Sequence, residues 1–158
     1  MPILEKDLIS ARTAWGNGLL EISRSFETEG IEMARKVASN MLDTLYGFDL
    51  GQVLFKPTLS GGSQTFRPTR EGALSYFVGH NSAYPKDSGF GIKFWREISS
   101  ETSTIFIDDT VAMWMGSVTL IDKDGQVTKV DKSWGYKLDV NGNLRIVLHH
   151  SSLPYEIK

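Results

Sequence analysis

The chain has 158 residues, of which 41% are hydrophobic and 23% charged, and this composition predicts one globular domain over residues 1–158. A formal net charge of −2 argues against nucleic acid and anionic membranes as partners, because both bind basic surfaces. The absence of cysteine excludes disulfides, thiolate nucleophiles and thiolate metal ligands. The first residues lack the pattern of a signal peptide and no apolar run is long enough to span a membrane, so we expect a cytoplasmic protein.

Two helices are predicted in the first third of the chain. Apolar residues recur at steps of three and four over residues 8–22, and the same period returns over residues 27–45. Thr28 is the expected cap of the second helix, and Gly47 is its expected stop.

A loop with short extended pieces is expected over residues 48–69, followed by a third, short helix. Thr69 is a suitable cap for this helix, which we expect over residues 70–78. Residues 79–91 are rich in Gly, Pro, Asn and Ser and predict a long connection, which makes this stretch a candidate functional loop.

The second half of the chain is predicted to form four β-strands, over residues 102–107, 111–121, 127–138 and 143–152. These runs are rich in β-branched and aromatic residues, and two of their separators, residues 122–125 and Asn141-Gly142, are hairpin turn signals. Helices followed by an antiparallel meander predict an α+β protein with the helices on one face of the sheet. Long strands must twist and bend, so the sheet is expected to be strongly curved and to enclose a cone-shaped cavity.

The last predicted strand ends in an unusual polar group. The hydrophobic run 144–148 gives way to two imidazoles and two hydroxyls, His149-His150-Ser151-Ser152. This places hydrogen-bonding and proton-transfer groups at the end of a core strand, where a pocket is expected, although a polar surface turn is the simpler alternative.

The histidines do not form a recognisable metal site. Successive strand residues point to opposite faces, so His149 and His150 cannot both bind one ion without a bulge. The remaining histidine, His80, follows the third helix, and three converging imidazoles would need all of them. We therefore expect no metal and no other cofactor, while a site completed by carboxylates such as Asp108 or Asp109 stays open.

A second polar group lies in the predicted loop, at Phe55-Lys56-Pro57-Thr58. Pro57 favours an extended conformation at Lys56, and the Lys56 and Thr58 side chains are donors that could face an anion. A solvated loop is the alternative. On the helix that follows, Tyr76 could turn its hydroxyl inward or simply pack in the core.

Aromatic residues complete the set of candidates. Phe90, Phe94 and Trp95 fall in one short stretch after the long connection. They could form the walls of a pocket or a subunit interface, and packing alone is the default for such residues.

Taken together and in order, these pieces resemble the iota-class carbonic anhydrases, which are NTF2-like proteins of bacteria, cyanobacteria and algal plastids. The resemblance covers residues 15–155 and rests on five motifs, at residues 55–58, 66–68, 89–95, 130–136 and 149–154. A more distant similarity exists to the association domain of calmodulin-dependent kinase II. The NTF2-like fold hosts enzymes, binding modules and dimerisation domains, so it does not by itself give an activity.

The resemblance implies reversible hydration of carbon dioxide to bicarbonate and a proton, without a metal in the members most similar to this chain. In those members bicarbonate lies among three hydroxyls, which correspond to Thr58, Tyr76 and Ser151. We infer that His149 handles the proton beside Ser151. The further substrate-binding candidates are Lys56, Phe55, Phe90, Phe94, Trp95 and His150. Other members are described as using a metal, so resemblance leaves that question open.

The pattern of the final strand conflicts with this assignment. Leu144, Ile146 and Leu148 form the cleaner apolar face, and continuing the alternation would put His150 and Ser152 inside. Either both sheet faces are buried, the outer one by a partner subunit, or a bulge shifts the phase. We place Ser151 inside and expect a homodimer through the outer sheet face.

Two other functions stay open at this point. One is a non-catalytic NTF2-like module that binds a small ligand or assembles partners. The other is an NTF2-like isomerase or hydrolase that acts on a larger organic substrate. A cavity much larger than bicarbonate would favour either of them over a carbonic anhydrase.

Overall fold

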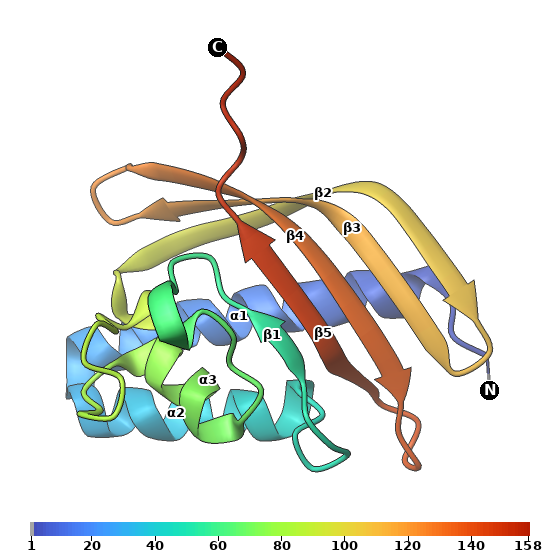
Figure 1. Cartoon of the computed structure of the whole chain (residues 1–158), viewed down its shortest axis with the longest axis horizontal. Coiled ribbons are helices and arrows are strands. Elements are labelled where there is room, and N and C mark those ends of the chain that lie inside the picture. Colours follow the sequence, from blue (N-terminus) through green and yellow to red (C-terminus); the bar gives the residue numbers. More distant parts are fainter. Residues whose placement is uncertain (1) are drawn as a thin grey trace.

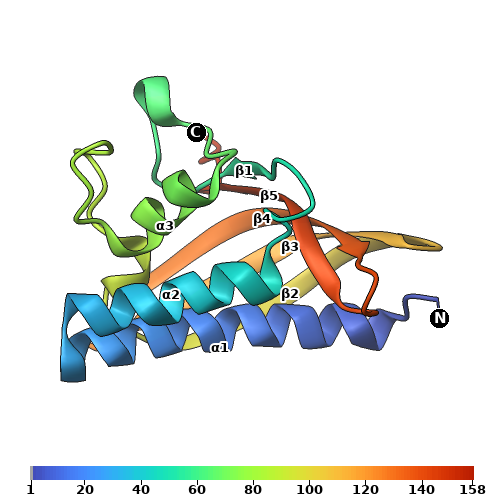
Figure 2. The ribbon, with the colours of Figure 1, turned by 90° about the horizontal axis from the view of Figure 1, so that it is seen from below.

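The computed structural model describes residues 2–158, which form three α-helices and a curved five-stranded sheet (Figure 1). The helices are α1 (Glu5–Glu29), α2 (Ile31–Leu45) and α3 (Arg70–Val78), with short 3-10 helices η1 (Gly62–Gln64) and η2 (Phe90–Ile92). The strands are β1 (Leu54–Lys56), β2 (Trp95–Asp108), β3 (Val111–Asp122), β4 (Val127–Leu138) and β5 (Leu144–Ser152). Their order is β1-β5-β4-β3-β2, with β1 parallel to β5 and the other pairs antiparallel. Figure 2 shows α1 and α2 side by side along one face of the sheet, which confirms the predicted α+β arrangement.

The two long helices are separated by a single residue, Gly30. Gly30 has a φ of 91°, which glycine adopts at little cost. Because this φ is not helical, α1 ends there. Thr28, the expected cap of the second helix, instead lies in the last turn of α1, where its hydroxyl donates to the Arg24 carbonyl at 3.0 Å. The predicted start of this helix was therefore wrong, whereas its end at Leu45 was correct. Among residues 2–158, no helix has the length and apolar character needed to cross a bilayer.

Helix α3 forms where the sequence predicted it. The Thr69 hydroxyl accepts a hydrogen bond from the Gly72 N–H at 3.3 Å, which satisfies one free donor of the first turn. The helix ends at Gly79, whose φ is 65°. Because α3 packs on α2 beside β1, its inward residues face the end of the sheet that carries the last strand.

Three of the four long strands were predicted to within a residue or two, but β2 begins at Trp95 rather than at Thr102. Residues 96–101 are largely polar and exposed, so they lack the apolar pattern of a strand. They nonetheless pair with β3, for example Ser99 with Thr119. Backbone pairing with β3 makes this segment a strand, because the pattern of its own side chains does not predict one.

A β-bulge in β5 resolves the conflict over which side chains point inward. Gly135 pairs with Leu148 and Tyr136 with Ile146, so Val147 is an extra residue on β5. Ile146 is therefore buried before the bulge, whereas His149 and Ser151 are buried after it, each 1% exposed. Of the two explanations offered by the sequence, the phase-shifting bulge is present.

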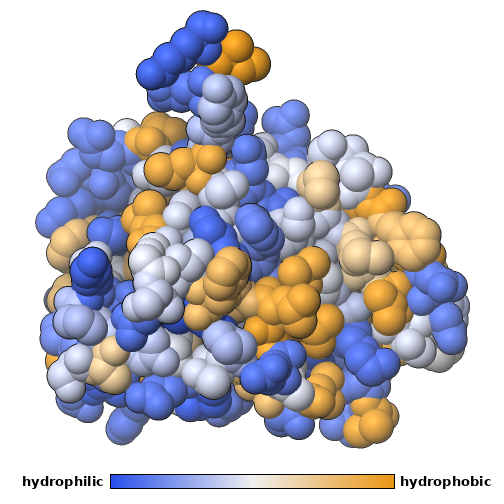
Figure 3. Space-filling view, viewed as in Figure 1, coloured by the Kyte–Doolittle hydropathy of each residue, from blue (hydrophilic) through white to orange (hydrophobic). Residues whose placement is uncertain are grey.

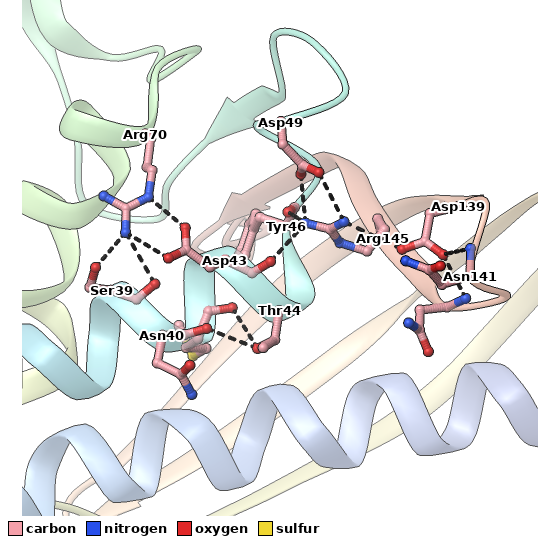
Figure 4. A network of polar contacts seen from close by, with 12 residues as sticks. Ser39, Asn40, Asp43, Thr44, Tyr46, Asp49, Arg70, Asp139, Asn141 and Arg145 are labelled. Carbon is pink, nitrogen blue, oxygen red and sulfur yellow. Dashed lines mark hydrogen bonds and ion pairs between the residues drawn. The ribbon is translucent and has the colours of Figure 1, made fainter.

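Arg145, at the start of β5, fixes the end of α2. Its guanidinium donates to the main-chain carbonyls of Asp43 at 2.8 Å and Tyr46 at 2.6 Å, and pairs with the Asp49 carboxylate at 2.7 Å (Figure 4). A cation at a helix C-terminus satisfies carbonyls that have no partner within the helix. Tyr46, which caps α2, is thereby held over β5 with its ring in the core.

Candidate active site

The parallel pairing of β1 with β5 brings two predicted hydroxyls together. Phe55 lies beside His149 and Lys56 beside His150, so Thr58, two residues beyond β1, reaches the end of β5. Thr58 Oγ1 is 2.5 Å from Ser151 Oγ, and both side chains are buried. Hydroxyls at this distance share a hydrogen bond.

Tyr76 completes a triad of hydroxyls from the other side. Its Oη accepts a hydrogen bond from the Leu59 N–H at 3.1 Å, and its ring is 6% exposed. Burial raises the pKa of Tyr76 to about 12, although hydrogen bonds from Leu59 and Thr58 oppose this rise. Tyr76 is therefore a neutral hydroxyl at physiological pH. We call Thr58, Tyr76 and Ser151 the hydroxyl triad.

His149 lies beside the triad, and the hydrogen bonds of its ring go to two other side chains. Its Nδ1 is 2.8 Å from Tyr46 Oη, and its Nε2 is 2.9 Å from Lys132 Nζ. Phe55 stacks on the imidazole with ring centroids 4.8 Å apart. Burial first, and then the charge of Lys132, lower the pKa of His149 well below its ordinary value, so the ring is neutral at neutral pH.

Lys132 of β4 connects His149 to the triad and was not among the predicted site residues. Its Nζ is 3.0 Å from Ser151 Oγ, and the side chain is 4% exposed. Burial, and to a smaller extent the nearby charge of Lys56, lower the pKa of Lys132 to about 7. A signal for it existed in the sequence. Val130, Lys132 and Trp134 alternate on β4, so the lysine shares the inward face of two apolar residues.

These contacts form one buried polar chain. Trp15 Nε1 donates to Tyr46 Oη at 3.0 Å, and Tyr46 contacts His149 as described above. The chain then passes through Lys132 and Ser151 to Thr58. Trp15 and Tyr46 also escaped prediction, because nothing in their local pattern separates them from ordinary core aromatics.

Several predicted substrate-binding residues lie around the triad. Lys56 Nζ donates to the Ser151 carbonyl at 2.9 Å, and burial lowers its pKa. Phe90 stacks on Tyr76 with centroids 5.6 Å apart, and Trp95 packs on Phe90 at 5.3 Å. Together with Phe55, these aromatic rings form an apolar wall beside the hydroxyls.

Two predicted residues do not belong to this group. His150 alternates with the buried His149 and Ser151, so it is exposed on the opposite face of the sheet. Phe94 has a φ of 62°, and its ring lies 6.2 Å from that of Phe26 and beneath the Lys123 ammonium. Neither side chain is among the contacts of the triad described above, so their part in substrate binding stays a prediction.

The ionisable side chains are not arranged as metal ligands. Within residues 2–158, no group of three His, Asp or Glu side chains is close enough to hold an ion. His80 is exposed beyond α3 and contacts the Val78 carbonyl through Nδ1 at 2.9 Å.

The fold is that of the NTF2-like proteins. An NTF2-like protein of unknown function from Pseudomonas putida KT2440 aligns with a TM-score of 0.51 and 11% identity, covering 92% of this chain and 91% of that one. A putative calcium/calmodulin-dependent protein kinase II association domain from Xanthomonas campestris aligns with 0.53 and 22%, covering 95% and 84%. At these identities the likeness shows the fold alone, and it confirms the predicted fold class.

Within this fold, the chain belongs to the metal-independent carbonic anhydrase family, whose model matches residues 6–153. The metal-independent carbonic anhydrase of Nostoc sp. (strain PCC 7120 / SAG 25.82 / UTEX 2576) is 46% identical over 154 residues, covering 98% of this chain and 75% of that protein. The crystal structure of a cyanobacterial iota-carbonic anhydrase complexed with bicarbonate aligns with a TM-score of 0.97 and 45% identity, over 99% and 95% of the two chains. The family resemblance seen in the sequence is confirmed, and the chain is a carbonic anhydrase of this class.

Proposed function

We propose that this chain interconverts carbon dioxide and bicarbonate at the hydroxyl triad. The observation that carries the proposal is the 2.5 Å contact between Thr58 Oγ1 and Ser151 Oγ, buried beside Tyr76. The bicarbonate present in the similar cyanobacterial structure supports the assignment of the ligand. The roles of the individual residues below are part of the proposal.

The triad acts by aiming neutral donors at the oxygens of the reacting molecule. When water attacks the carbon of carbon dioxide, negative charge develops on the oxygens of the product. The Tyr76 hydroxyl can donate its one hydrogen to such an oxygen, and the Thr58–Ser151 pair, whose mutual hydrogen bond uses one of its two hydrogens, can donate the other. A preorganised donor in a site that excludes water contributes about 3–4 kcal/mol to transition-state stabilisation.

The apolar wall favours the binding of carbon dioxide, the other partner in the equilibrium. Carbon dioxide is nonpolar, and the rings of Phe55, Phe90 and Trp95 offer it an apolar contact next to the hydroxyls. The same rings limit the access of bulk water to the triad. Lys56, held against the Ser151 carbonyl, adds positive charge near the position of the anion.

The test is the rate of carbon dioxide hydration, measured by stopped flow with a pH indicator after exhaustive chelation. Thr58→Ala, Tyr76→Phe and Ser151→Ala should each lower kcat/KM by about 10²-fold or more while circular dichroism stays unchanged. Ser152→Ala, the neighbouring serine on the other face of β5, is the matched control. Wild-type rates in all three triad variants would place the site elsewhere, and loss of activity on chelation would contradict the metal-free part.

We also propose that the chain forms a homodimer through the outer face of the sheet. One residue from each of the five strands lies in register across this face: Phe106, Met113, Gly135, Leu148 and Leu54. Phe106 is 57% exposed and Leu54 66%. Figure 3 looks onto this face and shows hydrophobic side chains gathered over β5 and β1 and again toward the β2–β3 hairpin. Aligned, exposed apolar side chains of this kind are typical of an interaction surface.

Sedimentation velocity tests the dimer. Phe106→Lys and Leu54→Lys should shift the protein to a monomer, whereas Val140→Lys, at a fully exposed side chain, should not. An unchanged sedimentation coefficient in the first two variants would exclude this face. The cytoplasmic location and the single domain stay predictions, to be tested by cell fractionation and by the cooperativity of unfolding.

A further inference from the structure

Lys132 is a buried lysine without a carboxylate partner. None of the ion pairs formed among residues 2–158 involves it. Its Nζ instead lies over the faces of Trp15 and Trp134, 4.8 Å and 5.5 Å from the ring centroids. The two indole faces attract an ammonium but do not replace the anion that a buried charge normally pairs with, so a bound anion would favour the charged form of Lys132.

The Lys132 nitrogen directs one of its positions, which holds either a hydrogen or a lone pair, at the triad. With a proton on Nδ1, which donates to Tyr46, His149 offers its Nε2 lone pair to an N–H of Lys132. This bond forms whether Lys132 is an amine or an ammonium. The position that faces Ser151 Oγ, 3.0 Å away, is therefore free to alternate between a lone pair and an N–H.

We propose that Lys132, as its neutral amine, accepts the proton that the attacking water loses, and that this proton travels through the Ser151 hydroxyl. The inference rests on the function proposed above and adds the proton acceptor to it. His149 then serves as a positioning residue, which orients the Lys132 nitrogen through Nε2.

The step balances without any other reactant. The water oxygen forms a bond to the carbon of carbon dioxide, and one C=O π pair moves onto its oxygen. The water proton passes to Ser151 Oγ as the Ser151 proton passes to Lys132 Nζ. The products are bicarbonate and the Lys132 ammonium, which then releases its proton to buffer and restores the amine. In the reverse direction the ammonium is the acid that dehydrates bicarbonate.

The surrounding charges favour this cycle. The groups that face Lys132 are Trp15 of α1, His149 and Ser151 of β5, Trp134 of its own strand, and the charged Lys56 beyond β5. Burial and Lys56 bring the pKa of Lys132 to about 7, so the amine and the ammonium are both populated near neutral pH. Bound bicarbonate is the anionic partner that the Lys132 ammonium otherwise lacks.

His149 is less suited to accept the proton directly. Both of its ring nitrogens are already engaged, by Tyr46 and by Lys132. Its pKa lies well below the ordinary value, which makes its imidazolium a poor product near neutral pH. The two acceptors therefore predict different pH profiles for the same reaction.

The experiment is the pH profile of hydration kcat/KM in the full chain, measured for the wild type and for two lysine variants. In the wild type, kcat/KM should rise tenfold per pH unit below an inflection at about 7 and level off above it. Lys132→Met, which cannot bind a proton, and Lys132→Arg, which cannot release one, should lose the inflection and fall by about 10²–10⁴-fold. Lys129→Met, an exposed lysine of the same strand, is the control.

Each outcome decides a separate point. If Lys132→Met or Lys132→Arg keeps both rate and inflection while Thr58→Ala and Ser151→Ala lose activity, the lysine inference is overturned and the triad stands. If the triad variants also keep wild-type rates, the proposed site itself fails. A wild-type inflection well below pH 6.5 would assign the proton to His149, and this measurement needs no variant to fold. Recovery of a Lys132→Ala variant by added ethylamine would support the amine as the acceptor.

Discussion

Tyr46→Phe is the sharpest test of the buried polar chain, because it removes one oxygen and leaves the ring in place. Tyr46 is fully buried, and its Oη joins Trp15 Nε1 at 3.0 Å to His149 Nδ1 at 2.8 Å. Phenylalanine fills nearly the same volume, so no cavity of consequence forms. The substitution therefore measures the hydrogen bonds and little else.

The expected loss follows from the two partners left behind. Trp15 Nε1 and His149 Nδ1 would both be buried without a hydrogen bond, at about 1–3 kcal/mol each. The free energy of unfolding should fall by about 2–6 kcal/mol, at the upper end of single-substitution effects. In a chain of this size the melting temperature should fall by about 2–4 °C for each kcal/mol.

Urea unfolding followed by tryptophan fluorescence is the assay. Tyr155→Phe, at a site 87% exposed, is the matched control and should change the free energy of unfolding by less than about 0.5 kcal/mol. A loss below about 1 kcal/mol in Tyr46→Phe would refute the reasoning, because it would mean that Trp15 and His149 do not depend on this hydroxyl.

Three further predictions concern other parts of the fold. Gly135→Ala would place a Cβ 2.9 Å from Leu148 Cβ at the bulge. Urea unfolding should show that the free energy of unfolding falls by about 1–3 kcal/mol. An unchanged free energy would mean that β4 and β5 separate easily there. Arg67→Met leaves the buried Asp87 carboxylate without its 2.8 Å partner and should lower the free energy of unfolding by about 3–5 kcal/mol. If the losses of Arg67→Met and Asp87→Leu simply add in the double variant, the two side chains do not stabilise each other. Between about pH 7 and about pH 10 the unfolded chain keeps a proton on Lys132 that the folded chain has lost. The free energy of unfolding of the wild type should therefore rise relative to Lys132→Met by about 1.4 kcal/mol per pH unit, and a constant difference would contradict the lowered pKa.

Local signals in the sequence were sufficient for most elements of the fold. Thr69 caps α3 as its position predicts, and the turns at residues 122–125 and at Asn141-Gly142 connect the expected strands. The start of β2 was missed because pairing with β3, and not side-chain pattern, makes residues 96–101 extended.

The triad could not be assembled from local pattern. Thr58 and Ser151 meet because β1 pairs in parallel with β5, a long-range choice that no short motif encodes. Family resemblance gave the residues, while the bulge at Val147 gives the reason that Ser151 points inward. Lys132 could have been found, since strand alternation places it on the buried face of β4.

The parallel contact between β1 and β5 also sets the order in which the proposed site can form. Thr58 and Ser151 are 93 residues apart in the chain, so they meet only after the final strand has docked. Closing so long a loop is slow compared with forming α1 and α2. During refolding, the far-ultraviolet helical signal should therefore return before hydration activity does, and a newly made chain should stay inactive until its last strand is in place.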